Sequence, residues 1–308
     1  MALASSSENN TIRTCIPRWC CLNSNFFNVF FTRASFPMPH PAHIKNKLII
    51  SIFLSCIFGS RLAWSQQTPE VQTIRIEGTV VAFDMVKIPQ GQVTIQSGGV
   101  SVTRSLDKVL WVSQTEVTWD LFDIFVYGLD LKNTSPSPEV AAVARPSKPY
   151  VLPGRIFGHL GFPASAMSYY HANKFTQWLS AKTGKKFRLL TEPEWEYLCA
   201  KGRKPNAVVT DEGWVWENSD DKLRKVGTKP TNEVGLSDLL GNVAEWVQSD
   251  AEVPFTKGGH YLDDAATVAC TARAPQSPEW NMTDPQLPKS RWWLSDASYI
   301  GLRLAMEE

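Results

Sequence analysis

Residues Gly235–Trp246 read GLSDLLGNVAEW, a stretch with neither a helical nor a strand period. Asp238 and Glu245 supply anionic oxygens within it. Gly241 and Asn242 tolerate a positive φ angle at low cost. The stretch therefore predicts a sharp turn that carries two carboxylates.

Two interpretations of this turn follow from its residue types. Carboxylate oxygens, together with backbone carbonyls turned inward, are the hard ligands that calcium requires. Alternatively, the two acids cap backbone N–H groups of a tight turn and bind no ion. The stretch is not an EF-hand loop, so its spacing alone leaves both interpretations open.

Upstream of the turn, apolar periodicity predicts strands and a first helix. Alternation of apolar and polar residues over 71–93 indicates strands interrupted at Gly78 and Pro89. Thr118 is the expected N-cap of a helix in which apolar residues recur every three or four positions. Residues 131–153 are rich in proline, serine and alanine, which predicts a surface loop.

Two further helices are expected between this loop and the turn. The first begins near Ser168 and stops before Gly184. A short strand at 187–190 precedes a Thr191–Glu194 capping box, which starts a helix that runs to about Gly202. Trp178 and Trp195 lie on these helices and are expected in the core, because tryptophan is usually largely buried.

Several segments resemble, in order, the sequence signatures of one known family. GLSDLLGNVAEW is similar to the GLYDM-GNVWEW signature of the formylglycine-generating enzyme (sulfatase-modifying factor) family. The other matching segments are DMVKIPQG (84–91), QTEVTW (114–119), the block at 166–202 containing FRLLTEPEWEYLCAKG, KGGHY (257–261) and GLRLA (301–305). The resemblance spans about residues 81–305.

This resemblance implies a fold and a domain organisation. The expected fold is one α+β domain over 81–308, related to C-type lectins, with little regular secondary structure. The helices at 168–183 and 192–201 are expected to pack on its sheet. Residues 66–80 are expected to form an N-terminal strand or linker.

The resemblance also implies a calcium site in the Gly235–Trp246 turn. The side chains of Asp238 and Glu245 would bind the ion, as would the carbonyls of Gly241 and Val243. Leu239 is a further carbonyl ligand in this interpretation. Such oxygen ligands suit calcium.

Active members of the family use two cysteines, five residues apart, to bind copper(I) and oxidise a substrate cysteine to formylglycine. Cys270 matches the second of these cysteines, but Ala265 stands five residues before it. Copper(I) selects soft thiolate ligands, so one cysteine cannot form the two-thiolate site and no copper is expected. Ala244 and His260 also depart from the signatures, because they replace the first tryptophan of GNVWEW and the serine of GGSW.

These departures favour an exported binding module that takes a protein, a small molecule or a glycan. Two alternatives stay open: a copper-dependent oxidase that matures sulfatases, and an enzyme of altered chemistry that uses Cys270 as its only catalytic residue. The candidate ligand-contacting residues are His260, Trp292, Trp293 and Arg303. Adjacent residues of an extended segment face opposite ways, so one of the two tryptophans is expected to line a cleft.

Residues 1–65 have the organisation of an upstream extension followed by a signal peptide. A basic run at 43–47 precedes an apolar core at 48–58, and small residues precede a cleavage site near Ser65. Met38 is the expected natural initiator. The apolar core is short for a stable membrane span, although a short anchor is the alternative. The domain is therefore expected in a bacterial-type periplasm or outside the cell.

Charge and cysteine content limit the remaining possibilities. Of 31 basic and 30 acidic residues, six basic and one acidic precede residue 66, which leaves 25 basic against 29 acidic residues in the domain. This mildly acidic balance gives no electrostatic basis for nucleic-acid binding. Cys199 and Cys270 are the two cysteines after the cleavage site, and either a disulfide or two free thiols fits an oxidising compartment.

Overall fold

The computed structural model describes residues 68–131, 135–148 and 157–308. The signal peptide and initiator predicted within 1–65 lie outside these residues, as do two parts of the loop predicted over 131–153. None of the helices in the described part of the chain is long and apolar enough to cross a membrane.

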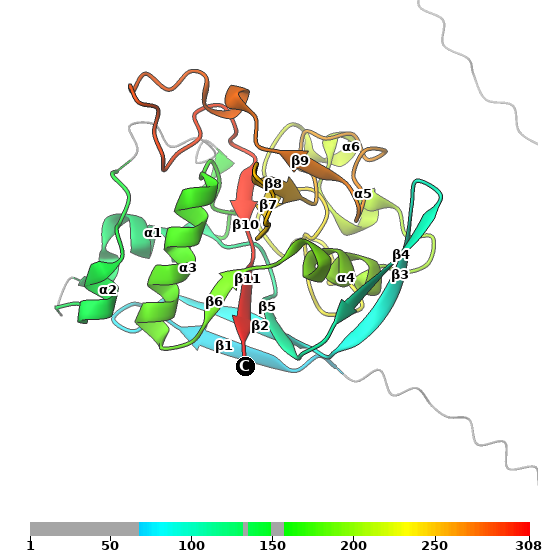
Figure 1. The fold of residues 1–308 in the computed structure, drawn as a ribbon, viewed down its shortest axis with the longest axis horizontal. Coiled ribbons are helices and arrows are strands. Elements are labelled where there is room, and N and C mark those ends of the chain that lie inside the picture. The colour runs from blue at the N-terminus through cyan, green and yellow to red at the C-terminus, as the bar shows by residue number, and fades with distance from the viewer. Residues whose placement is uncertain (1–67, 132–134, 149–156) are drawn as a thin grey trace, which may run out of the picture. The chain divides into compact units, whose positions relative to one another are not determined.

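A five-stranded antiparallel sheet forms the centre of the domain (Figure 1). Its order is β1 (Val71–Arg75), β2 (Ala82–Ile88), β5 (Leu110–Ser113), β11 (Leu304–Glu307) and β6 (Phe187–Leu189). The C-terminal strand β11 therefore pairs between segments from the first and middle parts of the chain. The strands predicted within 71–93 are confirmed, with breaks at Gly78 and Pro89.

Two smaller sheets complete the strand content of the described residues. One has the order β10 (Ile300–Leu302), β7 (Ala244–Trp246), β8 (Phe255–Lys257) and β9 (Arg273–Pro275). In it, β10 runs parallel to β7, and the other pairs are antiparallel. The other is a hairpin of β3 (Gly91–Ser97) and β4 (Val100–Leu106).

The predicted helices occur where their capping signals place them. Helix α1 (Trp119–Tyr127) follows Thr118, and α3 (Tyr169–Thr183) extends from the Ser168 cap to Gly184. Helix α4 (Glu192–Gly202) begins with the complete Thr191–Glu194 capping box. The expected loop region contains a short helix, α2 (Pro138–Ala142). Further helical turns among the described residues include η1 (Leu129–Leu131), α5 (Val209–Glu212), α6 (Trp216–Ser219) and η3 (Pro278–Asn281).

Hydrophobic cores cover both faces of the five-stranded sheet. Met85 belongs to the core shared with α1 and α3, whereas the next residue, Val86, belongs to the core under α4. This alternation follows from the two-residue period of a strand. Figure 1 shows α1 and α3 on one side of β11, and α4 with the β3–β4 hairpin on the other. Trp178 and Trp195 are fully buried, as predicted. The α+β fold class is confirmed.

A buried histidine in the first core makes stability dependent on pH. His171 donates from Nδ1 to the Trp292 carbonyl at 3.0 Å, while its Nε2 is buried and finds no hydrogen-bond partner in the described part of the chain. The rings of Phe122 and Trp293 lie 4.7 and 4.5 Å from the imidazole. Burial in this aromatic surrounding lowers the pKa of His171 to about 3.

We expect acid to destabilise the fold through His171. Between pH 6.5 and pH 3 the unfolded chain binds a proton that the folded chain does not, so stability falls as the pH falls through this window. The loss is about 1.4 kcal/mol per pH unit, or about 2 kcal/mol between pH 6.5 and 5. Urea unfolding of the wild type and His171→Phe at several pH values measures the contribution of His171, as the difference between the two proteins in how their unfolding free energy changes with pH. Equal pH slopes in both would contradict it.

Candidate functional site

The Gly235–Trp246 turn has the sharp backbone that its residues predict. Gly241 and Asn242 both adopt a positive φ, at 79° and 55°, and Asp238 does so at 55°. A Cβ atom at Gly241 would lie 2.1 Å from the Trp214 carbonyl oxygen. Glycine is required there because neither the φ angle nor the space admits a side chain.

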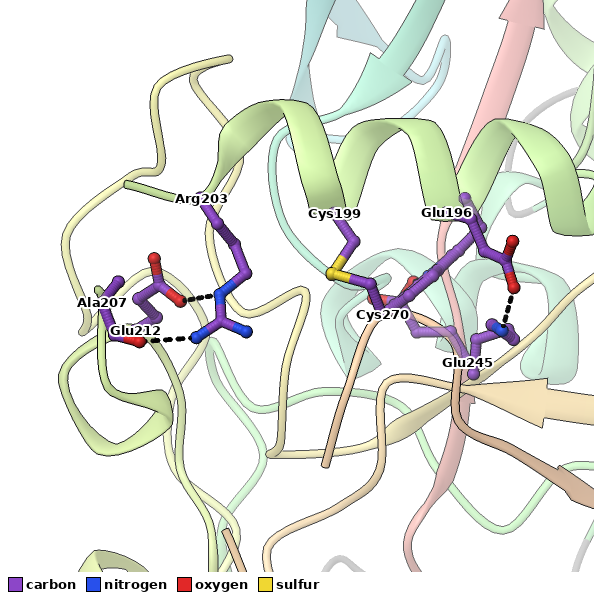
Figure 2. The surroundings of a disulfide bond; sticks show 9 residues. Glu196, Cys199, Arg203, Ala207, Glu212, Glu245 and Cys270 are labelled. Atoms are coloured by element: carbon purple, nitrogen blue, oxygen red, sulfur yellow. Dashed lines mark hydrogen bonds and ion pairs between the residues drawn. A yellow bond between two sulfur atoms is a disulfide. The ribbon is translucent and has the colours of Figure 1, made fainter. Parts of the chain in front are cut away.

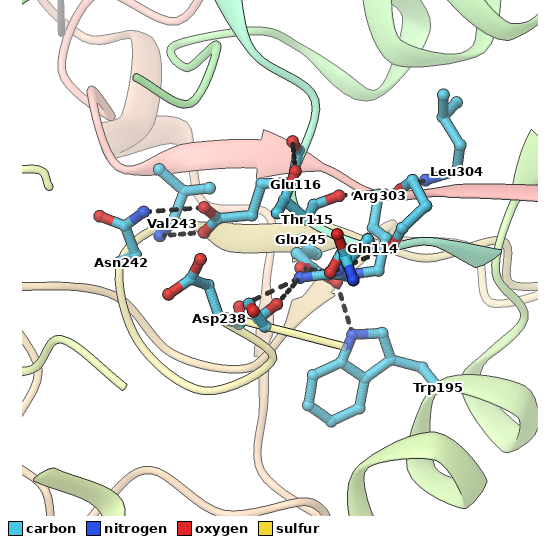
Figure 3. Close-up of polar contacts among 12 residues, drawn as sticks. Gln114, Thr115, Glu116, Trp195, Asp238, Asn242, Val243, Glu245, Arg303 and Leu304 are labelled. Carbon is cyan, nitrogen blue, oxygen red and sulfur yellow. Dashed lines mark hydrogen bonds and ion pairs between the residues drawn. The ribbon is translucent and has the colours of Figure 1, made fainter. Parts of the chain in front are cut away.

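Four buried charged residues meet beneath this turn, and we call them the carboxylate–arginine cluster. Its members are Glu116, Asp238, Glu245 and Arg303 (Figure 3). Arg303 donates from Nε to Glu245 at 2.8 Å. Its other nitrogens donate to the carbonyls of Ser113, Gln114, Ser237 and Asp238. Arg303 was predicted to contact a ligand; here it is buried and binds the turn to β5.

The two acids of the turn have different partners. Glu245 accepts from Arg303 through one oxygen and from the Trp195 indole through the other, at 2.8 Å each. Asp238 accepts from the Gly227 backbone at 2.6 Å through Oδ2, whereas its Oδ1 is buried and has no hydrogen-bond partner among the described residues. An unsatisfied buried carboxylate oxygen is costly, which makes Oδ1 the exceptional atom of the cluster.

Glu116 is the member of the cluster that the sequence analysis did not identify. It accepts from the Val243 backbone at 3.0 Å and from the Asn242 side chain at 2.7 Å, so it holds the second half of the turn. It lies 129 positions before Glu245 in the chain. In the sequence, Glu116 was noted only as part of the QTEVTW segment, and nothing in that segment indicated that it contacts the turn.

The cluster has three carboxylates against one guanidinium. Burial raises the pKa of Glu116 well above its ordinary value, and the charges of Asp238 and Glu245 raise it further. Burial also raises the pKa values of Asp238 and Glu245, with Arg303 acting in the opposite direction. The cluster therefore favours a bound positive charge or a proton.

The predicted calcium ligands lie together in one turn. In the described part of the chain, no three histidine, cysteine, aspartate or glutamate side chains are grouped so as to hold a metal ion by themselves. The ligand set would therefore depend on backbone carbonyls as well as on Asp238 Oδ1, which has no other partner. Each Glu245 oxygen already accepts one hydrogen bond, although a carboxylate oxygen has a second lone pair.

Cys270 forms a disulfide bond with Cys199 on α4 (Figure 2). The two Cα atoms are 5.6 Å apart, and 71 positions separate the residues in sequence. Ala265, five residues before Cys270, is half-buried and packs against the hydrophobic core under α4, to which both cysteines belong. Cys270 therefore has no free thiolate in this state.

A cavity of about 200 Å³ lies next to the segment between His260 and Arg273. We call it the His260 pocket. It brings together two of the positions that depart from the family signatures, Ala244 and His260. Its other lining residues are Thr256, Gly259, Asp263, Thr267, Ala272, Arg273, Ala274, Trp280, Tyr299 and Ile300. Because Ala244 lines the pocket, a tryptophan side chain at this position would extend into it.

Trp292 and Trp293 face different surroundings, as expected for adjacent residues. Trp293 is buried in the core and stacks on Trp119, with ring centroids 6.5 Å apart. Trp292 is half-buried and contacts Tyr170 edge to face at 4.9 Å. Neither lines the His260 pocket.

Comparison with known proteins gives matches over most of the domain. Residues 76–284 match the family model described as "Sulfatase-modifying factor enzyme 1-like domain". Two curated proteins are similar over shorter stretches. The chain is 29% identical over 114 residues to the chaperone protein LppX of Paenibacillus barcinonensis, covering 27% of this chain and 41% of the relative. It is 28% identical over 140 residues to the formylglycine-generating enzyme of Mycobacterium tuberculosis, covering 40% of this chain and 43% of the relative. The matches thus span less than half the length of these relatives.

Solved structures that share the fold include the following two. Treponema denticola variable protein 1 superposes with a TM-score of 0.55 at 20% identity, covering 78% of this chain and all of that one. PvdO from Pseudomonas aeruginosa superposes with a TM-score of 0.56 at 20% identity, covering 79% of this chain and all of that one. At this identity the likeness concerns the fold alone.

Proposed function

The chain belongs to the sulfatase-modifying factor family, whose domain model covers residues 76–284, and from this premise we propose that it is a binding domain without formylglycine-generating activity. Its ligand site would be the His260 pocket. The ligand would be a small molecule, a glycan or an exposed group of a partner protein.

The Cys199–Cys270 disulfide carries this proposal. Copper(I) in a protein needs soft ligands, and the matching site offers Cys270 with Ala265 in place of the second cysteine. The disulfide removes the remaining thiolate, and nucleophilic chemistry at Cys270 requires that thiolate as well. The same bond therefore counts against the enzyme of altered chemistry.

We expect the purified domain, loaded with copper(I), to make no aldehyde from a peptide that carries the sulfatase-type Cys-x-Pro-x-Arg motif. Mass analysis of the peptide measures the product. The experiment is run with the disulfide intact and again after reduction, because only the reduced protein exposes Cys270. A copper-dependent aldehyde that disappears in Cys270→Ser would sink the proposal.

We also propose that calcium binds the Gly235–Trp246 turn. Asp238 and Glu245 would supply side-chain oxygens, and Leu239, Gly241 and Val243 would supply carbonyls. The excess of carboxylates and the unpartnered Asp238 Oδ1 support this site. The ion would neutralise part of the buried negative charge and fix the turn. Its role would be structural, because the turn borders the pocket only through Ala244.

Calcium is expected to raise the melting temperature, because a ligand that binds only the folded state stabilises it by mass action. Thermal melts in chelator and with added calcium test this, with magnesium as the ion control. Asp238→Asn should abolish the calcium increment, whereas Asp264→Asn, at an exposed acid outside the turn, should not. Identical melts of the wild type in chelator and in calcium would rule the site out.

Export is the third part of the proposal. A disulfide that closes 71 residues is typical of proteins in an oxidising compartment. This supports a periplasmic or extracellular location reached through a signal peptide that is cleaved near Ser65. Sequencing the N-terminus of the mature protein from the native host tests it.

A further inference from the structure

The chemistry of the His260 pocket depends on which side chains face it. In the β8–β9 pair, Thr256 is opposite Ala274 and Lys257 is opposite Arg273. Lys257 donates to Glu196 of α4 at 2.7 Å, so the Lys257 side chain points away from the pocket. Because residues alternate along a strand, Thr256 and Ala274 face the pocket. Arg273 also lines the pocket, but its guanidinium lies 3.8 Å from the Glu192 carboxylate, which offsets its charge, and over the Phe255 ring.

The imidazole of His260 is neutral in this arrangement. The Leu262 backbone N–H donates to its Nδ1 at 3.2 Å, which makes Nδ1 an acceptor and leaves the proton on Nε2. Nε2 lies 3.4 Å from the Asp263 carboxylate. Burial lowers the pKa of His260 and outweighs the opposite effect of Asp263. The histidine therefore does not cancel the charge of Asp263.

Asp263 provides the negative charge of the pocket, and aromatic rings provide much of its apolar wall. The Tyr299 ring contacts that of His260, with centroids 3.9 Å apart and planes tilted by 33°, and the buried Trp280 lines the same cavity. One Asp263 oxygen accepts from the His260 backbone at 2.9 Å, which fixes the carboxylate beside the rings. Aromatic faces and a carboxylate together attract organic cations.

We propose, building on the binding function above, that the His260 pocket takes a small organic cation. Its ammonium group would lie beside Asp263, and its alkyl part would lie against Trp280 and Tyr299. The volume limits the ligand, because a cavity of about 150 Å³ holds benzene and this one is slightly larger. The bound group is a short alkylammonium, either free or at the end of a larger molecule.

Calorimetric titration with n-butylammonium, n-butanol and butyrate tests whether the pocket prefers a cation, because the three probes have nearly the same shape and differ in charge. Butylammonium should bind at least about tenfold more tightly than the other two. Asp263→Asn keeps an oxygen for the His260 backbone and should lose about tenfold in butylammonium affinity. Asp264→Asn, at an adjacent exposed acid, should leave the affinity unchanged. Tyr299→Leu should weaken binding without reversing the preference for the cation.

The outcomes separate this inference from the proposed function. Equal or tighter binding of butanol or butyrate would overturn the preference for a cation and leave a binding pocket of different chemistry. Absence of binding by all three probes to the folded wild type would overturn the inference. An equal loss in Asp263→Asn and Asp264→Asn would mean unspecific attraction to acidic surface and would overturn it as well. The absence of oxidase activity is decided separately, by the aldehyde assay.

Discussion

Replacing Arg303 by methionine is expected to destabilise the domain by about 3–5 kcal/mol, because it leaves the Glu245 carboxylate buried without its cation. The arginine side chain is fully buried and makes five hydrogen bonds, four of them to backbone carbonyls. Methionine fills a similar volume but satisfies none of these acceptors. Urea unfolding followed by tryptophan fluorescence measures the change.

Two further variants identify the cause of this loss. Arg303→Lys keeps the charge but cannot reproduce the planar fork of donors, so it should recover only part of the stability. The double variant Arg303→Met/Glu245→Gln should be more stable than the additive expectation, because position 245 then carries no unpaired charge. Arg188→Met removes a partly exposed pair with Glu194 and serves as the control, with an expected loss of at most about 1 kcal/mol. A loss no larger in Arg303→Met than in Arg188→Met would refute the assignment.

Removing the Cys199–Cys270 disulfide is expected to cost about 4 kcal/mol, which corresponds to a fall of about 8–16 °C in melting temperature. The bond constrains the unfolded chain between positions 71 residues apart, and the loss of that constraint gives the effect. Calorimetry of the Cys199→Ala/Cys270→Ala variant tests this. Both cysteines are buried, and alanine is chosen because it places no polar group in the core.

Reduction provides the matched control for this prediction. A dithiol reductant should lower the melting temperature of the wild type toward that of the double variant and leave the variant itself unchanged. The reduced wild type should also show increased proteolysis in the partly exposed 262–267 segment, which precedes Cys270 and includes Asp263 of the pocket. A double variant as stable as the oxidised wild type would contradict the prediction.

Much of the fold could be predicted from local sequence. The Ser168 cap, the Thr191–Glu194 capping box and the glycine after α3 fix helix ends through hydrogen bonds within a few residues. The positive φ angles of Gly241 and Asn242 also follow from residue type. Such features depend on short-range sterics and capping, which a sequence pattern records directly.

The site depended on contacts that no local pattern contains. Glu116 joins the turn across more than a hundred residues, and Arg303 reaches it from the end of the chain. The sequence left the state of Cys199 and Cys270 open, because a disulfide requires a particular Cα separation that only packing of α4 against the 258–275 segment provides.

The sequence by itself determined the family signatures, the positions of helices α1, α3 and α4, the strands within 71–93 and at 187–190, and the absence of a second cysteine near Cys270. The tertiary structure decided that Cys270 is oxidised, that Arg303 is buried and holds the turn, and that His260 and Asp263 share a pocket with Trp280 and Tyr299. The physical reason is range: capping and turn formation act over a few residues, whereas a buried charge or a pocket is defined by side chains that only the packed fold brings together.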